Sequence, residues 1–168
     1  MRNIGRGTFA ELASYVSEED PAAELRAFRR ASKGAFVQAL DLEAVGGEEH
    51  VLLALKQTVE LKRSQLLAKK PEVDFLLRVA GTGQIAKAVE IAGAKPASRT
   101  LLVSFGPKAA VARALESIGR TKELRAYSEK APGRKAAARV GPLERSSAVG
   151  PGDPIAKLLA ERASLLHR

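Results

Sequence analysis

Cysteine and tryptophan are absent from this sequence, and aromatic residues make up only 4% of it. Without cysteine there can be no disulfides, no thiolate zinc ligands and no cysteine nucleophile. Because aromatic side chains are so scarce, the core must be built from leucine, valine, isoleucine and alanine. A chain without disulfides fits a reducing compartment, and we expect a cytoplasmic protein.

Long apolar runs are also missing. No stretch reaches the roughly 18–20 residues that a membrane-spanning helix needs. Residues 1–12 carry charges too often to be a secretory signal. We therefore expect a soluble protein with no membrane partner. The length of 168 residues favours a single domain, residues 1–168, that buries about two-thirds of its unfolded surface.

Acidic residues are too few to balance the basic ones. The chain has 28 lysines and arginines against 19 aspartates and glutamates, which gives a formal net charge of +9 at pH 7. Such a charge favours an anionic partner, above all nucleic acid. A soluble domain from an organism with basic proteins would have the same charge, so the two interpretations stay open.

The periodicity of apolar residues predicts strands and helices in mixed order. Proline and glycine mark several of their ends. Strands are expected at 2–13, 35–43, 99–105 and within 122–128, and helices at 21–32, 48–65, 71–80, 85–92, 107–119 and 154–166. We therefore expect an α+β fold (mixed α/β), with a small, mostly antiparallel or mixed sheet of about four strands. Helices pack on this sheet, and some of them form a central helical cluster.

Residues 129–152 differ from the rest of the chain. This stretch combines many basic residues with repeated proline and glycine, including Pro132, Gly133, Gly141 and Pro142. Such composition disfavours regular structure. We expect a flexible basic loop or a weakly structured insertion here.

Few residues could carry chemistry. Of the two histidines, His50 lies in the first turn of a predicted helix and His167 lies next to the C-terminal residue. A capping or solvated role is the better interpretation of His50 than a catalytic base. Asp41 and Glu43 would point the same way in a strand, which a solvated strand face also explains. We therefore expect no enzyme activity, no metal, no cofactor and no small-molecule substrate.

The segment Gly81-Thr82-Gly83-Gln84 joins two predicted helices. It lacks the spacing of a P-loop and follows a helix, so the dinucleotide-binding context is missing too. One interpretation is an anion site at the free N–H groups of the second helix. The other is a tight turn, in which Gly81 adopts the left-handed conformation, Thr82 caps the next helix and Gly83 avoids a clash.

Basic residues gather in two places, 56–70 and 120–145. The first group is Lys56, Lys62, Arg63, Lys69 and Lys70, and the second is Arg120, Lys122, Arg125, Lys130, Arg134, Lys135, Arg139 and Arg145. Each can be a solvated face. The second can also be a mobile arm that contacts a phosphate backbone.

Several linked motifs resemble one known family. They are His50-Val51-Leu52, Asp74-Phe75-Leu76-Leu77, Ala80-Gly81-Thr82-Gly83-Gln84-Ile85, Gly93-Ala94-Lys95 and the apolar strand from Thr100 to Phe105. Their order and spacing over residues 50–105 are similar to those of the KEOPS accessory subunit known as PRPK-binding protein, in its archaeal type. Asp74 replaces a common Glu, and Gly83 stands where many relatives carry a longer polar or basic residue.

The resemblance implies a non-catalytic subunit of the complex that makes threonylcarbamoyladenosine in tRNA. Such subunits bind the small atypical kinase/ATPase subunit of KEOPS, and archaeal ones hold the single-stranded 3′ CCA end of tRNA. The residues carried over as tRNA-binding are Arg78, Thr82, Gln84, Lys87 and Lys95. For the kinase contact, which needs an exposed apolar helix face, the C-terminal helix is the candidate, with Ile155, Leu158 and Leu159. The alternative is a protein-interaction module that regulates the kinase without contacting RNA.

Overall fold

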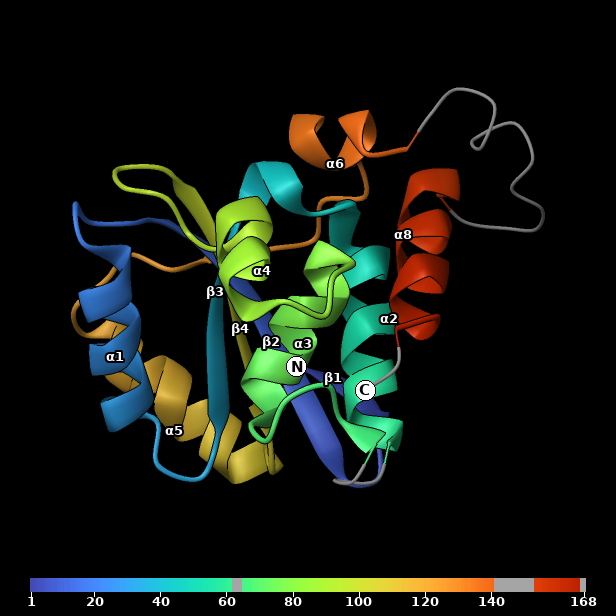
Figure 1. The fold of residues 1–168 in the computed structure, drawn as a ribbon. Helices are drawn as coiled ribbons and strands as arrows, with labels where there is room; N and C mark the ends of the chain where they lie inside the picture. The colour runs from blue at the N-terminus through green and yellow to red at the C-terminus, as the bar shows by residue number, and fades with distance from the viewer. Residues whose placement is uncertain (62–64, 141–152, 167–168) are drawn as a thin grey trace. The chain divides into compact units, whose positions relative to one another are not determined.

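The computed structural model describes residues 1–61, 65–140 and 153–166, and the chain divides into two compact units (Figure 1). The first, the sheet unit, comprises Met1–Leu42 and Ala94–Tyr127, and the second, the helical unit, comprises Glu43–Gly93 and Ser128–Arg168. The described residues hold seven α-helices and a five-stranded antiparallel sheet, which confirms the α+β class. The expectation of a single domain rests on length alone and stays a prediction.

The sheet unit is built around strand β4, Arg99–Gly106, for which the sequence predicted a strand over 99–105. This strand lies between β2, Thr8–Val16, and β3, Phe36–Asp41, and is antiparallel to both. The other edge of β2 pairs with β1, Arg2–Gly5, and with the short β5, Arg125–Ala126. The strand order is β1-β2-β4-β3, with β5 beside β2.

Residues 2–13 form a hairpin and not the single strand that we expected. Chain reversal falls at Gly5, Arg6 and Gly7, which have φ values of 106°, 50° and 70°. Such positive φ angles suit glycine, because a Cβ atom disfavours them. The two glycines that the sequence pattern had placed inside a strand therefore mark the turn between β1 and β2.

Two helices cover one face of this sheet. They are α1, Pro21–Ala31, and α5, Lys108–Gly119. Helix α1 begins where Asp20 predicts it, since its carboxylate accepts a hydrogen bond from the N–H of Ala23 at 2.9 Å. Phe28 of α1 and Ile118 of α5 pack against sheet residues in a core cluster that is completed by Tyr15, Val37 and Leu102.

The helical unit contains α2, α3, α4, α6 and α8. Their bounds are Gly47–Glu60, Pro71–Ala80, Ile85–Ala92, Arg134–Ala138 and Pro154–Ser164. Helix α8 lies beside α2 and α3, although more than 90 residues separate it from the end of α2 along the chain (Figure 1). The predicted central cluster of helices therefore includes the C-terminal helix.

The described part of the expected flexible loop, residues 129–140, is packed into the helical unit. The N–H of Glu48 donates to the Glu129 carbonyl at 2.8 Å, and that of Gly133 donates to the Val45 carbonyl at 2.8 Å. Gly47 has a φ of +81°, and a Cβ there would lie 2.4 Å from the carbonyl oxygen of Lys130. The glycine therefore leaves room for the segment, and the two hydrogen bonds hold it in place. Residues 141–152 lie outside the described residues.

No helix in the described ranges is long and apolar enough to cross a membrane.

Candidate functional site

The turn between α3 and α4 is set by the end of α3. Gly81 adopts the left-handed conformation, with φ 66° and ψ 37°. Its N–H donates to the carbonyl of Arg78 at 3.1 Å, and the N–H of Thr82 donates to the carbonyl of Leu77 at 3.1 Å. This pair of hydrogen bonds is a Schellman motif. The predicted role of Gly81 is confirmed.

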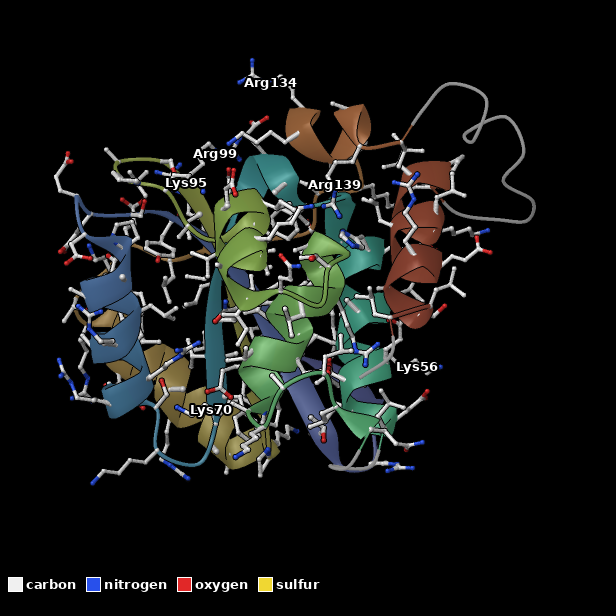
Figure 2. All side chains as sticks on the ribbon, viewed as in Figure 1. Lys56, Lys70, Lys95, Arg99, Arg134 and Arg139 are labelled. Atoms are coloured by element: carbon white, nitrogen blue, oxygen red, sulfur yellow. The ribbon has the colours of Figure 1, made fainter. Side chains whose placement is uncertain are left out.

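Arg139 satisfies the two carbonyls of α3 that the Schellman motif leaves open. Its guanidinium donates to the carbonyl of Val79 at 3.1 Å and to that of Ala80 at 2.6 Å (Figure 2). All of the last four carbonyls of α3 therefore have partners. Burial, and next the charge of Arg162, lowers the pKa of Arg139. The sequence left open whether Arg139 belongs to a solvated face or to a mobile basic arm, but the structure gives it a structural role.

Helix α4 exposes most of its surface. Ala88 and Ala92 are its fully buried residues, and α4 packs on α3. The side chains of Ile85 and Val89 are 54% and 51% exposed. Lys87 is exposed as well, on another side of the helix, because residues two apart do not share a face. The spacing of Ile85, Ala88, Val89 and Ala92 is typical of one apolar stripe on a helix. The helix nevertheless buries only its small residues, the two alanines.

Gln84 and Gly83 precede this helix and are both exposed. Gln84 is the N-cap, but its side chain makes no capping hydrogen bond. Thr82 is half-buried, and its hydroxyl accepts a hydrogen bond from the N–H of Gln84 at 3.3 Å. Thr82 therefore braces the turn and does not cap α4 itself. A Cβ on Gly83 would meet no atom within 4 Å, so the expected clash at this position is absent.

Arg78 does not fit the predicted contact with RNA phosphates. It is only 2% exposed, and its guanidinium donates to Asp74 at 2.8 Å and to the carbonyl of Ala163 at 3.2 Å. A cation held in this way is not available to a phosphate in solvent. Its role is to join α3 to α8.

The remaining predicted tRNA contacts fall in two units. Thr82, Gln84 and Lys87 lie together at the start of α4 in the helical unit. Lys95 belongs to the sheet unit, where its carbonyl accepts hydrogen bonds from the hydroxyls of Ser17 and Ser98. These bonds fix the main chain at Lys95.

The predicted kinase contact on α8 is a buried face. Ile155 is 8% exposed and Leu159 is 1% exposed, and both pack against Ala136 and Val140. Leu158 is partly buried against the same cluster. The sequence shows that these residues share one face of a helix, but here the segment 129–140 covers that face. The exposed leucine at this end of the chain is Leu165, at 68%.

We therefore expect Leu159→Ala to destabilise the protein, with any effect on a partner secondary to that. Removal of a fully buried leucine costs about 2–5 kcal/mol. Leu165→Ala, at an exposed position, should change the free energy of unfolding by less than about 0.5 kcal/mol. Urea titrations followed by circular dichroism would measure both. Equal stability of the two variants would contradict the assignment of α8 to the core.

His50 is a capping residue in the core. It is fully buried, and its Nδ1 accepts a hydrogen bond from the N–H of Gly46 at 3.0 Å. Burial, and next the charge of Arg139, lowers its pKa to about 3. A base this weak removes few protons at neutral pH. His167 lies outside the described residues.

The two carboxylates that the sequence placed on one strand face belong to different elements. Asp41 is buried at the end of β3, whereas Glu43 belongs to a short 3-10 helix, Leu42–Ala44. Arg134 donates to Glu43 at 3.1 Å from its main-chain N–H and from its side chain (Figure 2). These hydrogen bonds lower the pKa of Glu43. Among the described residues, no group of three or more acidic or histidine side chains could hold a metal ion.

The first basic group, 56–70, is partly accounted for. Lys56 pairs with Glu60 one turn along α2, at 3.8 Å, whereas Lys69 and Lys70 are exposed. Lys62 and Arg63 lie outside the described residues, as does Arg145 of the second group.

No protein-family model matches this chain, and no curated protein shows significant similarity to it.

Proposed function

We propose that this protein is a non-catalytic accessory subunit of the KEOPS complex, which makes threonylcarbamoyladenosine in tRNA. It binds the atypical kinase/ATPase subunit and recruits tRNA through the 3′ CCA end. The motifs over residues 50–105, in their order and spacing, are the basis of this proposal. The low pKa of His50 argues against acid–base chemistry by its imidazole.

The exposed face of α4 is the observation that carries the RNA-binding part. A single-stranded end offers flat base faces, hydrogen-bonding base edges and phosphates. Ile85 and Val89 form an exposed apolar pair one helical turn apart, and such a pair can contact base faces in a protein with few aromatic residues. Gln84 supplies a donor and an acceptor for a base edge, and Lys87 supplies a cation.

A second function is favoured by the same apolar pair. Exposed isoleucine and valine on one helix face also suit a protein partner. The protein would then be an interaction module that regulates the kinase subunit and leaves RNA to other subunits. The two functions differ in what charge reversal at Lys87 does, because an apolar protein contact depends little on that cation.

Fluorescence anisotropy with labelled tRNA, intact or without its CCA end, tests the proposal. Intact tRNA should bind at least about tenfold more tightly, since stacking of one base contributes about 1–3 kcal/mol. Lys87→Glu should weaken binding of intact tRNA several-fold and have little effect on truncated tRNA. This difference locates the contact at the CCA end.

The matched control is Lys69→Glu, which reverses an exposed cation of the same unit outside α4. It should lower the affinity for the two RNAs equally and only slightly. Equal binding of intact and truncated tRNA by the unmodified protein would show that the CCA proposal is wrong. If Ile85→Asp abolishes co-elution with the kinase subunit while Lys87→Glu leaves tRNA binding unchanged, the interaction module is the correct function.

A further inference from the structure

A basic groove lies in the sheet unit, where the end of α1 meets the second half of α5. It has a volume of about 470 Å³. Its lining includes four cationic side chains and one carboxylate: Arg30, Lys33, Arg113, Arg120 and Glu116. We call this feature the α1–α5 groove.

Three of these cations are not held by an ion pair or a hydrogen bond within the described residues. Arg30, Lys33 and Arg113 are exposed, and none of them makes an ion pair or hydrogen bond with any residue that the structure describes. The carboxylate of Glu116 is occupied by Arg120, at 2.6 Å. Neighbouring Arg29 shows the contrast, since its guanidinium donates to the Val37 carbonyl and to the side chain of Gln38.

The positions of the cations suit an extended anion. Arg113 lies in the middle of α5 and Arg120 is its C-cap. The two are seven residues apart, so they lie on one side and about 10 Å apart along the helix axis. Arg30 and Lys33 line the groove from the end of α1. A favourable interaction with the dipole of α1 explains why a cation stands at position 30, in the last turn of that helix. The same explanation does not apply to Arg113, which lies within α5 and not at its end.

We propose that the α1–α5 groove binds the phosphate backbone of double-helical RNA. Contacts to phosphates from Lys and Arg are independent of sequence and position an RNA without reading it. The large exposed apolar residues of the sheet unit are Met1, Val16 and Phe36, and none lines the groove. It therefore lacks the apolar anchors on which protein partners and membrane surfaces depend.

This inference rests on the proposed function only in taking the polyanion to be RNA. The groove and the face of α4 would serve different parts of a tRNA. The groove binds a helical stem through its backbone, whereas α4 binds the single-stranded end.

Binding of a short, blunt-ended RNA duplex tests the groove separately from the CCA end. With this duplex as the labelled probe in fluorescence anisotropy, the double variant Lys33→Glu/Arg113→Glu should bind at least about tenfold more weakly than the unmodified protein. The slope of log affinity against log salt should fall by about 2, because two phosphate contacts are lost. Lys33→Gln/Arg113→Gln should show a smaller loss in the same direction.

The control is Arg6→Glu/Lys69→Glu, which changes the net charge equally at two exposed positions outside the groove. It should weaken duplex binding less than about twofold, since short-range phosphate contacts dominate. Equal losses for the two double variants would overturn the proposal and leave a net-charge effect only. Retained duplex binding together with lost binding to phosphatidylserine vesicles would also overturn it.

The groove and the CCA proposal can fail independently. If the groove variant loses the duplex but intact and truncated tRNA bind equally, the groove inference stands and the CCA proposal is wrong. If CCA removal weakens binding but the groove variant binds the duplex normally, the groove inference is wrong and the CCA proposal stands.

Discussion

Replacement of Asp74 by alanine should lower the free energy of unfolding by about 3–5 kcal/mol. Asp74 is fully buried and accepts three short hydrogen bonds. They come from the hydroxyl of Thr58 at 2.7 Å, the N–H of Leu67 at 2.7 Å and the guanidinium of Arg78 at 2.8 Å. Without this carboxylate, the buried guanidinium loses its counter-charge, and this is the costliest consequence.

Chemical denaturation followed by circular dichroism measures the effect. Arg78→Met in the Asp74→Ala background should restore part of the stability, because it removes the unpaired charge and keeps an apolar stem. The matched exposed pair is Arg120–Glu116, where Glu116→Ala should cost less than about 1 kcal/mol. A loss below about 1 kcal/mol for Asp74→Ala would contradict the buried ion pair.

The protein should also lose about 2 kcal/mol of stability between pH 7 and pH 5 because of His50 alone. The pKa of His50 is about 3 in the folded protein, whereas its ordinary value, which applies to the unfolded chain, is 6.5. Between these two values the unfolded chain binds the proton and the folded protein does not. Stability from this group is therefore complete above pH 6.5 and is lost as the pH falls below that value.

The measurement is the free energy of unfolding at pH 5, 6 and 7 for the unmodified protein and for His50→Gln. The glutamine side chain does not titrate. Its carbonyl oxygen can accept the hydrogen bond from the N–H of Gly46 that His50 accepts in the unmodified protein. The pH dependence of the variant should be flatter by about 1.4 kcal/mol per pH unit in the acid part of this range. Parallel pH profiles for the two proteins would mean that His50 is accessible to protons in the folded state.

Most helices and strands could be located from the sequence because their signals are local, whereas the hairpin at residues 2–13 and helix α6 were missed. Asp20 and Pro21 mark the start of α1, and the carboxylate of Asp153 caps α8 by accepting from the N–H groups of Ile155 and Ala156. The signal at Gly81 is local as well, because the two hydrogen bonds of this turn join residues no more than five apart in sequence. These signals depend on neighbours in sequence, so no tertiary information is needed.

Prediction from the sequence failed where the packing of distant segments decides which side chains are buried. Periodicity shows that Ile85 and Val89 share a helix face, and it shows the same for Ile155 and Leu159. The first pair is exposed and the second is buried, because the segment 129–140 covers α8 and nothing in the helical unit that the structure describes buries the outer face of α4. Two helices with the same apolar spacing therefore differ in whether that apolar pair is buried.

The same limit applies to the charged residues of the candidate site. The sequence alone identified the turn at residues 81–84, the excess of basic residues and the resemblance to the KEOPS subunit. Only the tertiary structure decided that Arg78 and Arg139 hold the fold together while Gln84, Lys87 and the cations of the α1–α5 groove are exposed. The reason is that the state of a charged side chain depends on whether a distant carboxylate or carbonyl reaches it, and local sequence does not record that distance.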